Sequence, residues 1–573
     1  MARFLEFTHT PMSNAVAAAG VYLLAVFVPF ETLTPIVRLP WQSLSNLEAV
    51  LLLALASWSV SVVVTRTAPR WRIPMFYAWL AFVVSMGVAA MLAPANRTNA
   101  VHMTGRLAAS AVVAVMTFNG IVNLTRLRTA QTLVVATGIV VAVVVVLEYL
   151  QMPTVLRWLH AFRPWIATVG GQVRAGGTLQ YPTIASMYLE VVFALGLGLM
   201  LAAFDAGSKW LASLWFFSLL LVGEAIAFTF TRAGLITMAV SAVVMLGTRL
   251  RVRGADAGVR LVGALATGIV VLLLSSRSLN ALGARMTTEG QDDWYRAEVA
   301  APHELDMSTN EVQYVSVKAR NAGRVVWDSN DDPPIYLSYH WLAQDGERVV
   351  AFQGDRTAFT QPVGPEETAS VEALVRAPRY PGTYQLEWDL VCEDRLWFST
   401  EPSALPSTLS RATVIGDPVG GPPVPVERPK RTVRPGRFVL WRTALDMIGH
   451  RPILGVGPDN FRLEYGEAAR LRNADPRTHT NNMYLEVLVG GGIVAAAAFA
   501  WFLFEVFRTF KAAARSGSPE ALALVAAGLA IAVHGLVDSF LSFAGTYILF
   551  ALIVGFATAA ARGMGTAADA HRV

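Results

Sequence analysis

The sequence predicts a mainly α polytopic membrane protein, a bundle of about 12 transmembrane helices with an inserted extracytoplasmic β-sandwich domain. Of the 573 residues, 54% are hydrophobic and only 15% are Asp, Glu, Lys or Arg, whereas a soluble protein carries roughly 25% charged residues. The mean hydropathy is +0.46. This composition excludes a single water-soluble enzyme, and it excludes intrinsic disorder because disordered chains are poor in apolar residues.

The apolar residues are concentrated in stretches that approach the roughly 20 residues needed to cross a bilayer core. Only the weak basic flank Arg3 precedes the first stretch, and no small-residue cleavage site follows it. We therefore expect a retained helix there and not a signal peptide. The expected membrane helices are 14–31, 47–65, 73–92, 104–123, 130–151, 183–204, 210–230, 233–249, 260–276, 482–507, 519–537 and 540–561.

The positions of Lys and Arg predict the orientation, because cytoplasmic loops are enriched in both residues. With the N-terminus inside, every even-numbered connection is basic: Arg66, Arg70 and Arg72; Arg126 and Arg128; Lys209; Arg249, Arg251, Arg253 and Arg260; Arg508, Lys511 and Arg515; Arg562 and Arg572. Both termini are then cytoplasmic and the segment 277–481 lies outside. The net charge of +5 is thus mostly arginine of the inner loops, and we expect no nucleic-acid partner.

Residues 300–415 change character and predict an extracytoplasmic domain. Apolar and polar residues alternate in several short runs, as in strands, and the pair Asp345-Gly346 is a hairpin signal. The runs are Val315, Val317 and Ala319 with Ser316 and Lys318 between them; Ile335, Leu337, Tyr339 and Trp341 with Ser338 and His340 on the other face; and Tyr384, Leu386, Trp388 and Leu390. We expect a β-sandwich of immunoglobulin-like type with a binding or spacer role.

A proline-rich linker, residues 416–436, and an amphipathic helix follow this domain. The linker composition is typical of a semi-rigid spacer. Phe438, Trp441, Leu445 and Ile448 then recur at helical spacing, so this helix is expected to lie on the outer membrane interface or against the bundle. The alternative is a packing helix of the outer domain. The segment 437–573 as a whole is expected to contain this helix and the C-terminal membrane helices, after an N-terminal membrane bundle over 1–280.

Common catalytic motifs are absent from the sequence. There is no Walker lysine motif, no HExxH, no Gly-x-Ser-x-Gly and no short Asp-x-Asp pair in an outer loop, so ATPase, zinc-protease and ordinary serine-hydrolase activities lack support. The single cysteine, Cys392, excludes an internal disulfide and a cysteine-based metal site. We expect neither a metal nor a cofactor.

Three polar clusters lie outside under this topology, against the positive-inside trend. They are RAGGTLQYP (174–182), TFTRAG (229–234) and the stretch 451–492, which holds His479 directly before a membrane helix. The planar guanidinium of arginine matches phosphate oxygens, and a histidine of near-neutral pKa can take a proton from a hydroxyl. Arginines at the outer membrane edge could thus clamp a lipid-linked diphosphate as a leaving group.

Each candidate also has a purely structural interpretation. Arg232 could be a snorkelling anchor, and His479 could cap its helix. His534 and Asp538 are more easily explained as a structural polar pair, and Glu190 as a buried carboxylate that partners arginine or supports proton movement. Gly455 and Gly457 are expected to set a turn.

At these residues the chain resembles the O-antigen ligase and O-antigen polymerase superfamily of bacterial membrane glycosyltransferases, which includes some protein O-oligosaccharyltransferases. The likeness covers roughly 40–280 and 437–560, excludes the β-domain, and departs from the family pattern at Thr183, Thr231, Asn481 and Gly491. The matching pieces are RAGGTLQYPTIASMYL, FTFTRAGLI, WRTALDMIGHRPILGVGPDNF, HTNNMYLEVLVGGGIV and HGLVDSFL.

The resemblance implies a GT-C-like bundle in the bacterial inner membrane that moves a glycan from undecaprenyl diphosphate to an acceptor hydroxyl outside. The acceptor would be lipid A core for a ligase, a glycan for a polymerase, or a protein. Inversion at the donor sugar without a metal is implied, with Arg174 and Arg232 on the diphosphate and His479 as the base. Expected substrate-binding residues are Arg163, Glu190, Asn482, Tyr484, Arg477, His534 and Asp538. A transporter or flippase and a sensor or scaffold are the competing classes.

Overall fold

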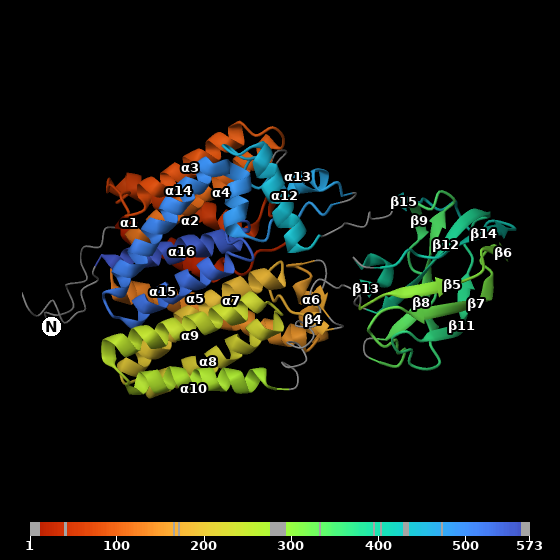
Figure 1. The fold of residues 1–573 in the computed structure, drawn as a ribbon, viewed down its shortest axis with the longest axis horizontal. Helices are drawn as coiled ribbons and strands as arrows, with labels where there is room; N and C mark the ends of the chain where they lie inside the picture. Colours follow the sequence, from red (N-terminus) through yellow and green to blue (C-terminus); the bar gives the residue numbers. More distant parts are fainter. Residues whose placement is uncertain are drawn as a thin grey trace, which may run out of the picture.

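The computed structural model describes residues 12–38, 43–163, 167–169, 172–275, 294–331, 334–393, 396–401, 404–427, 435–471 and 474–562. Within these ranges the chain is mainly helical, and a group of strands is inserted between α10 and α12. Figure 1 shows the strands as a body beside the helices, on the side of the bundle where α6 Pro153–Leu159, α12 Arg437–His450 and α13 Phe461–Ala468 lie.

The predicted membrane bundle is confirmed in its helical character, whereas the number of about twelve spans is not confirmed. Eight described helices are long and apolar enough to cross a membrane: α2 Asn46–Thr65, α4 Arg97–Gly120, α5 Leu124–Tyr149, α7 Pro182–Asp205, α8 Lys209–Phe228, α9 Arg232–Arg253, α14 Met483–Ala514 and α16 Ala544–Ala561. Four further apolar helices are shorter: α1 Met12–Phe27, α3 Phe76–Met91, α10 Ala257–Leu273 and α15 Pro519–His534. A total of twelve spans stays a prediction.

Two of the expected spans are shortened by one irregular segment. The helices expected at 519–537 and 540–561 end at His534 and begin at Ala544. Residues 535–543 between them form turns in which the N–H groups of Gly535 and Asp538 bond back to α15, while the carbonyls of both residues accept the N–H of Met483 at 2.7 and 3.1 Å. Hydrophobicity alone did not reveal this segment because it is itself apolar.

Helices α7 and α16 form the centre of the bundle. In each of them 94% of the most apolar 18-residue window is buried inside the protein, as expected for helices that are hydrophobic all round. Helix α7 packs against α5, α8, α9 and α15, and α16 packs against α4 and α14. Only 33% of the corresponding window is buried in α2 and α9, so these helices keep an apolar face for lipid.

Helix α14 is interrupted by a loop that packs into its side. Gly492 has φ 65° and ψ −169°, so the regular helix breaks there. The N–H groups of Val456 and Gly457 bond to the carbonyls of Val489 and Gly490, each at 2.9 Å. Gly455 and Gly457 have φ of +65° and +105°, and a Cβ on Gly455 would collide with the Val489 carbonyl. The expected turn at these glycines is confirmed, and it joins the 451–461 motif to the 479–492 motif.

Ion pairs connect neighbouring helices at the end of the bundle that lies away from the starts of α7, α9 and α14. Arg128 of α5 pairs with Glu520 of α15 at 2.6 Å, and Arg249 of α9 pairs with Asp205 at 2.7 Å and Asp256 at 2.6 Å. These arginines belong to the set that predicts the cytoplasmic side. The end of the bundle at which α7, α9 and α14 begin is called the site end. The ion pairs of Arg128 and Arg249 lie at the other end of the bundle.

The inserted strands, residues 297–427, form two sheets around one apolar core. One sheet has the order β15-β9-β8-β12-β14-β6 with β10 and β13 at its side, and the other has the order β11-β7-β5. The strands are β5 Ala297–Ala300, β6 Glu304–Ser308, β7 Val312–Asn321, β8 Ile335–Ala343, β9 Arg348–Ala351, β10 Thr357–Ala358, β11 Thr368–Arg376, β12 Gly382–Cys392, β13 Leu396–Trp397, β14 Leu409–Ile415 and β15 Val426–Glu427. The expected inserted β region is thus confirmed, and its immunoglobulin-like type stays a prediction.

The predicted strand faces agree with the burial pattern, with one addition. In β7 the residues Val315, Val317 and Ala319 are buried and Ser316 is exposed, as the alternation predicts. In β8 the second face is buried as well, because His340 stacks on Phe352 with ring centroids 4.3 Å apart. Strand β8 is therefore covered on both faces.

The amphipathic helix is present as α12 Arg437–His450, and its expected place at the outer membrane interface stays a prediction. Leu440, Ala444 and Met447 are the apolar residues that pack inward, against α13 Phe461–Ala468 and α14. Phe438 and Leu445 are 84% and 58% exposed. The helix has apolar residues on both faces, so the sequence period alone did not identify the side that contacts the bundle.

Candidate functional site

The first two predicted clusters are in direct contact. Arg174 ends the short strand β4 Gln172–Arg174, which pairs with β3 Ala167–Val169. Its Nε donates to the Thr229 carbonyl at 2.8 Å and its Nη2 donates to Thr231 Oγ1 at 3.2 Å. The next N–H, of Ala175, bonds to the carbonyl of Phe228 at 3.0 Å. The structure therefore holds Arg174 next to the turn that leads into α9.

Arg232 is the first residue of α9 and its side chain is exposed. Thr231 precedes Arg232 as the N-cap residue of α9. The hydroxyl oxygen of Thr231 also accepts the hydrogen bond from Arg174. The two arginines expected to bind diphosphate thus follow one another around a single turn at the site end. A helix N-terminus adds partial positive charge at that place.

Arg163 lies beneath the glycines that follow Arg174. It forms an ion pair with Glu148 at the end of α5, and the side chains are only 4% and 0% exposed. The other oxygen of Glu148 accepts the N–H groups of Gly176 and Gly177 at 3.0 and 2.8 Å. The pair therefore shapes the RAGG loop from inside, and Arg163 itself is buried.

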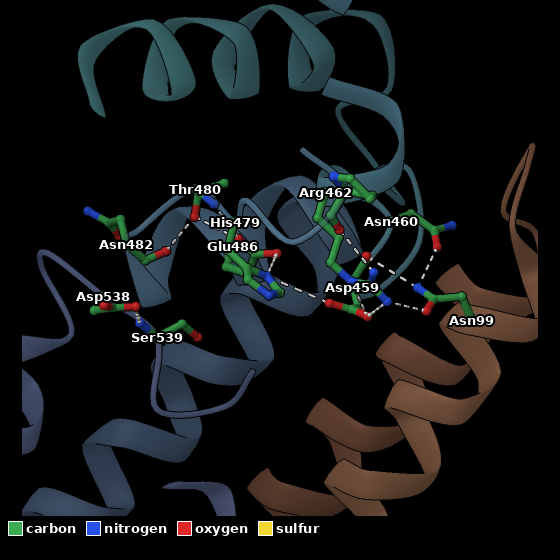
Figure 2. A network of polar contacts seen from close by, with 11 residues as sticks. Asn99, Asp459, Asn460, Arg462, His479, Thr480, Asn482, Glu486, Asp538 and Ser539 are labelled. Carbon is green, nitrogen blue, oxygen red and sulfur yellow. Dashed lines mark hydrogen bonds and ion pairs between the residues drawn. The ribbon is translucent and has the colours of Figure 1, made fainter. Parts of the chain in front are cut away.

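His479 lies between two carboxylates, as Figure 2 shows. Its Nδ1 is 3.5 Å from Glu486 Oε1 and 3.7 Å from Asp459 Oδ1, and the residue is 8% exposed. Glu486 belongs to the first turn of α14, and Asp459 belongs to the loop that packs into α14. Two motifs that are separate in the sequence meet at this imidazole.

The carboxylate oxygens of Glu486 and Asp459 that lie farther from His479 accept hydrogen bonds from other residues. Glu486 Oε2 accepts the backbone N–H of Thr480 at 2.9 Å and its Oγ1–H at 2.7 Å. Asp459 Oδ2 accepts Nε–H of Arg462 at 2.9 Å, and Arg462 also donates to Asn99 Oδ1 of α4 at 2.7 Å. The first oxygens of both carboxylates remain directed at His479.

The charge around His479 changes its protonation. Burial lowers the pKa of His479, but the hydrogen bond and charge of Glu486, followed by the charge of Asp459, outweigh burial and the opposing charge of Arg462. The net result is a pKa above the ordinary value for histidine. Among the described residues, Asp459, His479 and Glu486 also offer three ligand atoms within 4.8 Å of one another, a set that could hold a metal ion.

An aromatic contact connects the RAGGTLQYP motif to His479. The Phe543 ring lies 5.5 Å from the His479 ring and 6.1 Å from the Tyr181 ring, measured between centroids. Tyr181 lies near the end of the RAGGTLQYP motif and also interacts with Arg477. Arg477 in turn binds Asp475 through two 3.0 Å contacts. All three predicted clusters thus meet at the site end.

Residues 405–500 match the family model described as O-antigen ligase. The predicted resemblance is confirmed over this segment, which includes α12, α13, His479 and the first part of α14. The match begins inside the β region, earlier than the residue 437 expected from the motifs, and it does not reach Arg174 or Arg232. No curated protein matches the chain.

Below the matched segment, Glu190 and His534 form a buried polar pair. His534 Nδ1 lies 2.9 Å from Glu190 Oε2, and Thr237 of α9 donates to the same oxygen at 2.5 Å. The expected pairing of His534 with Asp538 is not the one observed in the side-chain hydrogen bonds, since Asp538 Oδ1 accepts the N–H of Ser539 at 2.8 Å. The Glu190 pair joins α7, α9 and α15.

Asn482 and Tyr484 have structural contacts at the start of α14. Asn482 caps α14, because its Oδ1 accepts the N–H of Leu485 at 2.9 Å and its Nδ2 donates to the Leu536 carbonyl at 3.0 Å. The Tyr484 hydroxyl donates to the Ala532 carbonyl at 2.8 Å. Both residues fix this end of α14 against α15 and the segment that follows it, and so help to place Glu486.

A small cleft opens beside the two carboxylates. Its polar lining is Asp459, Glu486, Ser539 and Ser542, and its apolar lining includes Phe82, Met86, Met103 and Leu107 of α3 and α4. Sequence reasoning missed Asp459, Glu486 and Glu148. Glu486 follows His479 by seven residues in the first turn of a helix, a usable signal, whereas the fold alone brings Asp459 and Glu148 to their places.

Proposed function

We propose that this protein is a membrane glycosyltransferase of the O-antigen ligase type. It would transfer a glycan from a polyprenyl diphosphate carrier to an acceptor hydroxyl on the outer face of the bacterial inner membrane. The match over 405–500 supports this class, since it covers His479 and both carboxylates beside it. The basic far end of the bundle supports a cytoplasmic assignment for that end and an outer assignment for the site end.

The chemistry follows from the two halves of the site. Arg174 and Arg232 stay protonated and would bind the diphosphate, stabilising the negative charge that develops on it as the glycosidic bond breaks. His479 would take the proton of the acceptor hydroxyl as its oxygen attacks the anomeric carbon. Attack on the face opposite the leaving diphosphate inverts the configuration of the donor sugar.

The observation that carries this proposal is the link from the RAGGTLQYP motif, whose Arg174 contacts the turn before Arg232, to the loop that holds His479. Phe543 and Tyr181 bridge them, with ring centroids 6.1 Å apart, and Phe543 also contacts the His479 ring. A purely anchoring role for the arginines does not require a buried histidine with two carboxylates beside them. Transfer from a diphosphate to a hydroxyl requires both halves in one place.

The direct test uses the full-length protein in proteoliposomes with a lipid-linked glycan donor. His479→Ala and Arg232→Ala should abolish transfer, whereas Arg508→Ala, a matched exposed arginine at the far end of α14, should not. All three variants should insert and express like the parent. Full activity in His479→Ala would contradict the assignment.

Analysis of surface glycans in a deletion strain separates the acceptor classes. Loss of attachment with normal chain length is expected for the proposed ligase. Single-repeat products would instead indicate a polymerase, and unglycosylated proteins an oligosaccharyltransferase. Deleting the β region, residues 300–415, should change acceptor use more than donor binding, and unchanged acceptor choice would make that region a spacer.

A further inference from the structure

We propose that Glu486 and Asp459 are positioning residues that hold the Nδ1–H of His479 and leave Nε2 as the nitrogen that accepts the proton. This inference rests on the proposed function, in which His479 is the base. Neither carboxylate was expected from the sequence, and both are brought to His479 by the fold.

The direction of the four carboxylate oxygens supports this role. Glu486 Oε2 is taken by Thr480, and Asp459 Oδ2 is taken by Arg462. The remaining oxygens, Oε1 and Oδ1, both lie nearest to Nδ1 of the same imidazole, at 3.5 and 3.7 Å. Neutral histidine carries one N–H, and a neighbouring acceptor decides which nitrogen carries it. Contacts of this length are common in catalytic sites without substrate and shorten in the reacting complex.

Both carboxylates are also held rigidly. Glu486 lies in a first helical turn that Asn482 caps at 2.9 Å. Asp459 has a left-handed backbone, φ +63°, a conformation that residues with a side chain adopt only rarely. The adjoining loop is bonded into the broken part of α14, and Asn99 of α4 donates to the Asp459 carbonyl at 3.2 Å. Strain of this kind persists where surrounding contacts impose one geometry.

The balance of charge around His479 points the same way. The titratable and charged groups that act on His479 are Glu486, Asp459 and Arg462, so two negative charges face one positive charge. The remaining negative charge favours the imidazolium that forms when His479 takes a proton. The two carboxylates are unequal, because Arg462 binds Asp459 directly, whereas Thr480 supplies the described hydrogen bonds to the second oxygen of Glu486.

In the proposed step the acceptor O–H proton moves to His479 Nε2 while the acceptor oxygen forms a bond to the anomeric carbon. The bond from that carbon to the phosphate oxygen breaks, and its electron pair leaves with the diphosphate. The resulting imidazolium donates both N–H groups, and its Nδ1–H faces Glu486 and Asp459. No additional reactant is needed for this balance.

The test is the pH dependence of kcat for Glu486→Gln and Asp459→Asn in proteoliposomes. Glu486→Gln should lower the pH-independent kcat about 10- to 100-fold, a part of the roughly 10²- to 10⁴-fold that a general base supplies. Its acid limb should move to lower pH, because the carboxylate that raises the pKa of His479 is gone. Asp459→Asn should change both quantities in the same direction by less. Glu467→Gln, an exposed carboxylate on α13, is the matched control and should change neither.

An unshifted acid limb in Glu486→Gln, with kcat lowered equally at every pH, would overturn the positioning role and leave only a structural one. Glu486→Asp guards against misfolding, since it keeps the charge and should retain an acid limb close to that of the parent. Loss of activity with EDTA that Mg²⁺ or Mn²⁺ restores would also overturn the inference, by making the three side chains a metal site. Failure of the proposed function is distinct, because the parent protein would then transfer no glycan, or His479→Ala would transfer it normally.

Discussion

Removing one partner of the buried pair Arg163–Glu148 should destabilise the protein strongly. In Arg163→Met the Glu148 carboxylate would remain fully buried with only the N–H groups of Gly176 and Gly177 as partners. Leaving one charge of a buried pair uncompensated typically costs about 3–5 kcal/mol. Glu148→Gln should cost a similar amount, because it leaves the Arg163 guanidinium buried without an anion.

The double variant Arg163→Met/Glu148→Gln separates charge from packing. Replacement of a whole buried ion pair by neutral groups of similar volume is often neutral or stabilising. The amide oxygen introduced by Glu148→Gln can still accept the two glycine N–H groups, so the RAGG loop keeps its backbone bonds. The double variant should therefore recover most of the free energy of unfolding lost in each single variant.

Two measurements test this reasoning. The first is the free energy of unfolding by denaturant titration in detergent micelles, and the second is the binding of a lipid-linked diphosphate donor. The single variants should bind the donor more weakly, because the loop of Gly176 and Gly177 follows Arg174 closely, and the double variant should bind it like the parent. A double variant as unstable as the single ones would refute the charge argument, and a loss below about 1 kcal/mol in the single variants would show that water reaches the pair.

Two further predictions concern other parts of the bundle. Gly455→Ala should lower the free energy of unfolding by more than about 1 kcal/mol, because it places a Cβ at a left-handed position against the Val489 carbonyl. Gly449→Ala, at an exposed glycine of α12, is the control in a thermal unfolding experiment. Equal unfolding curves for the two variants would contradict the tight packing of the Gly455 loop on α14. The hydrogen bonds from Arg249 lower the pKa of Asp256 to about 2, so Asp256 stabilises the folded protein above its ordinary pKa and loses this effect as the pH falls through about 2. Asp256→Asn should have a lower Tm than the parent at pH 7, and the difference in Tm between the two proteins should shrink in acid. A difference in Tm that does not depend on pH would assign the effect to the helix cap instead of the charge.

The membrane helices were predictable because a helix that crosses a bilayer needs roughly 20 mostly apolar residues. Each of the twelve expected stretches coincides with a helix, and α7 and α16 show why the average composition is so apolar: they are buried nearly all round. Helix ends were less predictable. The 535–543 segment is as apolar as a span but turns back on α15, because its carbonyls are used to receive α14.

The candidate site residues were predictable where the residue type itself indicates a chemical role. Arginine and histidine in loops expected to lie outside stood out against the positive-inside trend, and the structure brings the three clusters together through Arg174, Tyr181 and Arg477. Glu486 carries a signal through its place in a helical turn close to His479, but Asp459 and Glu148 carry none, because Asp and Glu are ordinary in loops and at helix ends. Asp459 and Glu148 acquire their roles only from the close packing of glycine loops on neighbouring helices.

The site end separates two kinds of charge in a way that suits the proposed transfer. The N-terminus of α9 lies at the turn that holds Arg174 and Arg232, so backbone dipoles and guanidinium groups both favour an anion there. On the other side of Tyr181 and Phe543, two carboxylates face His479. The leaving diphosphate gains negative charge and the base gains positive charge during the same step, so a site with opposite fields at its two ends stabilises both changes at once. An arrangement with all cations together would stabilise the leaving group but oppose protonation of the base.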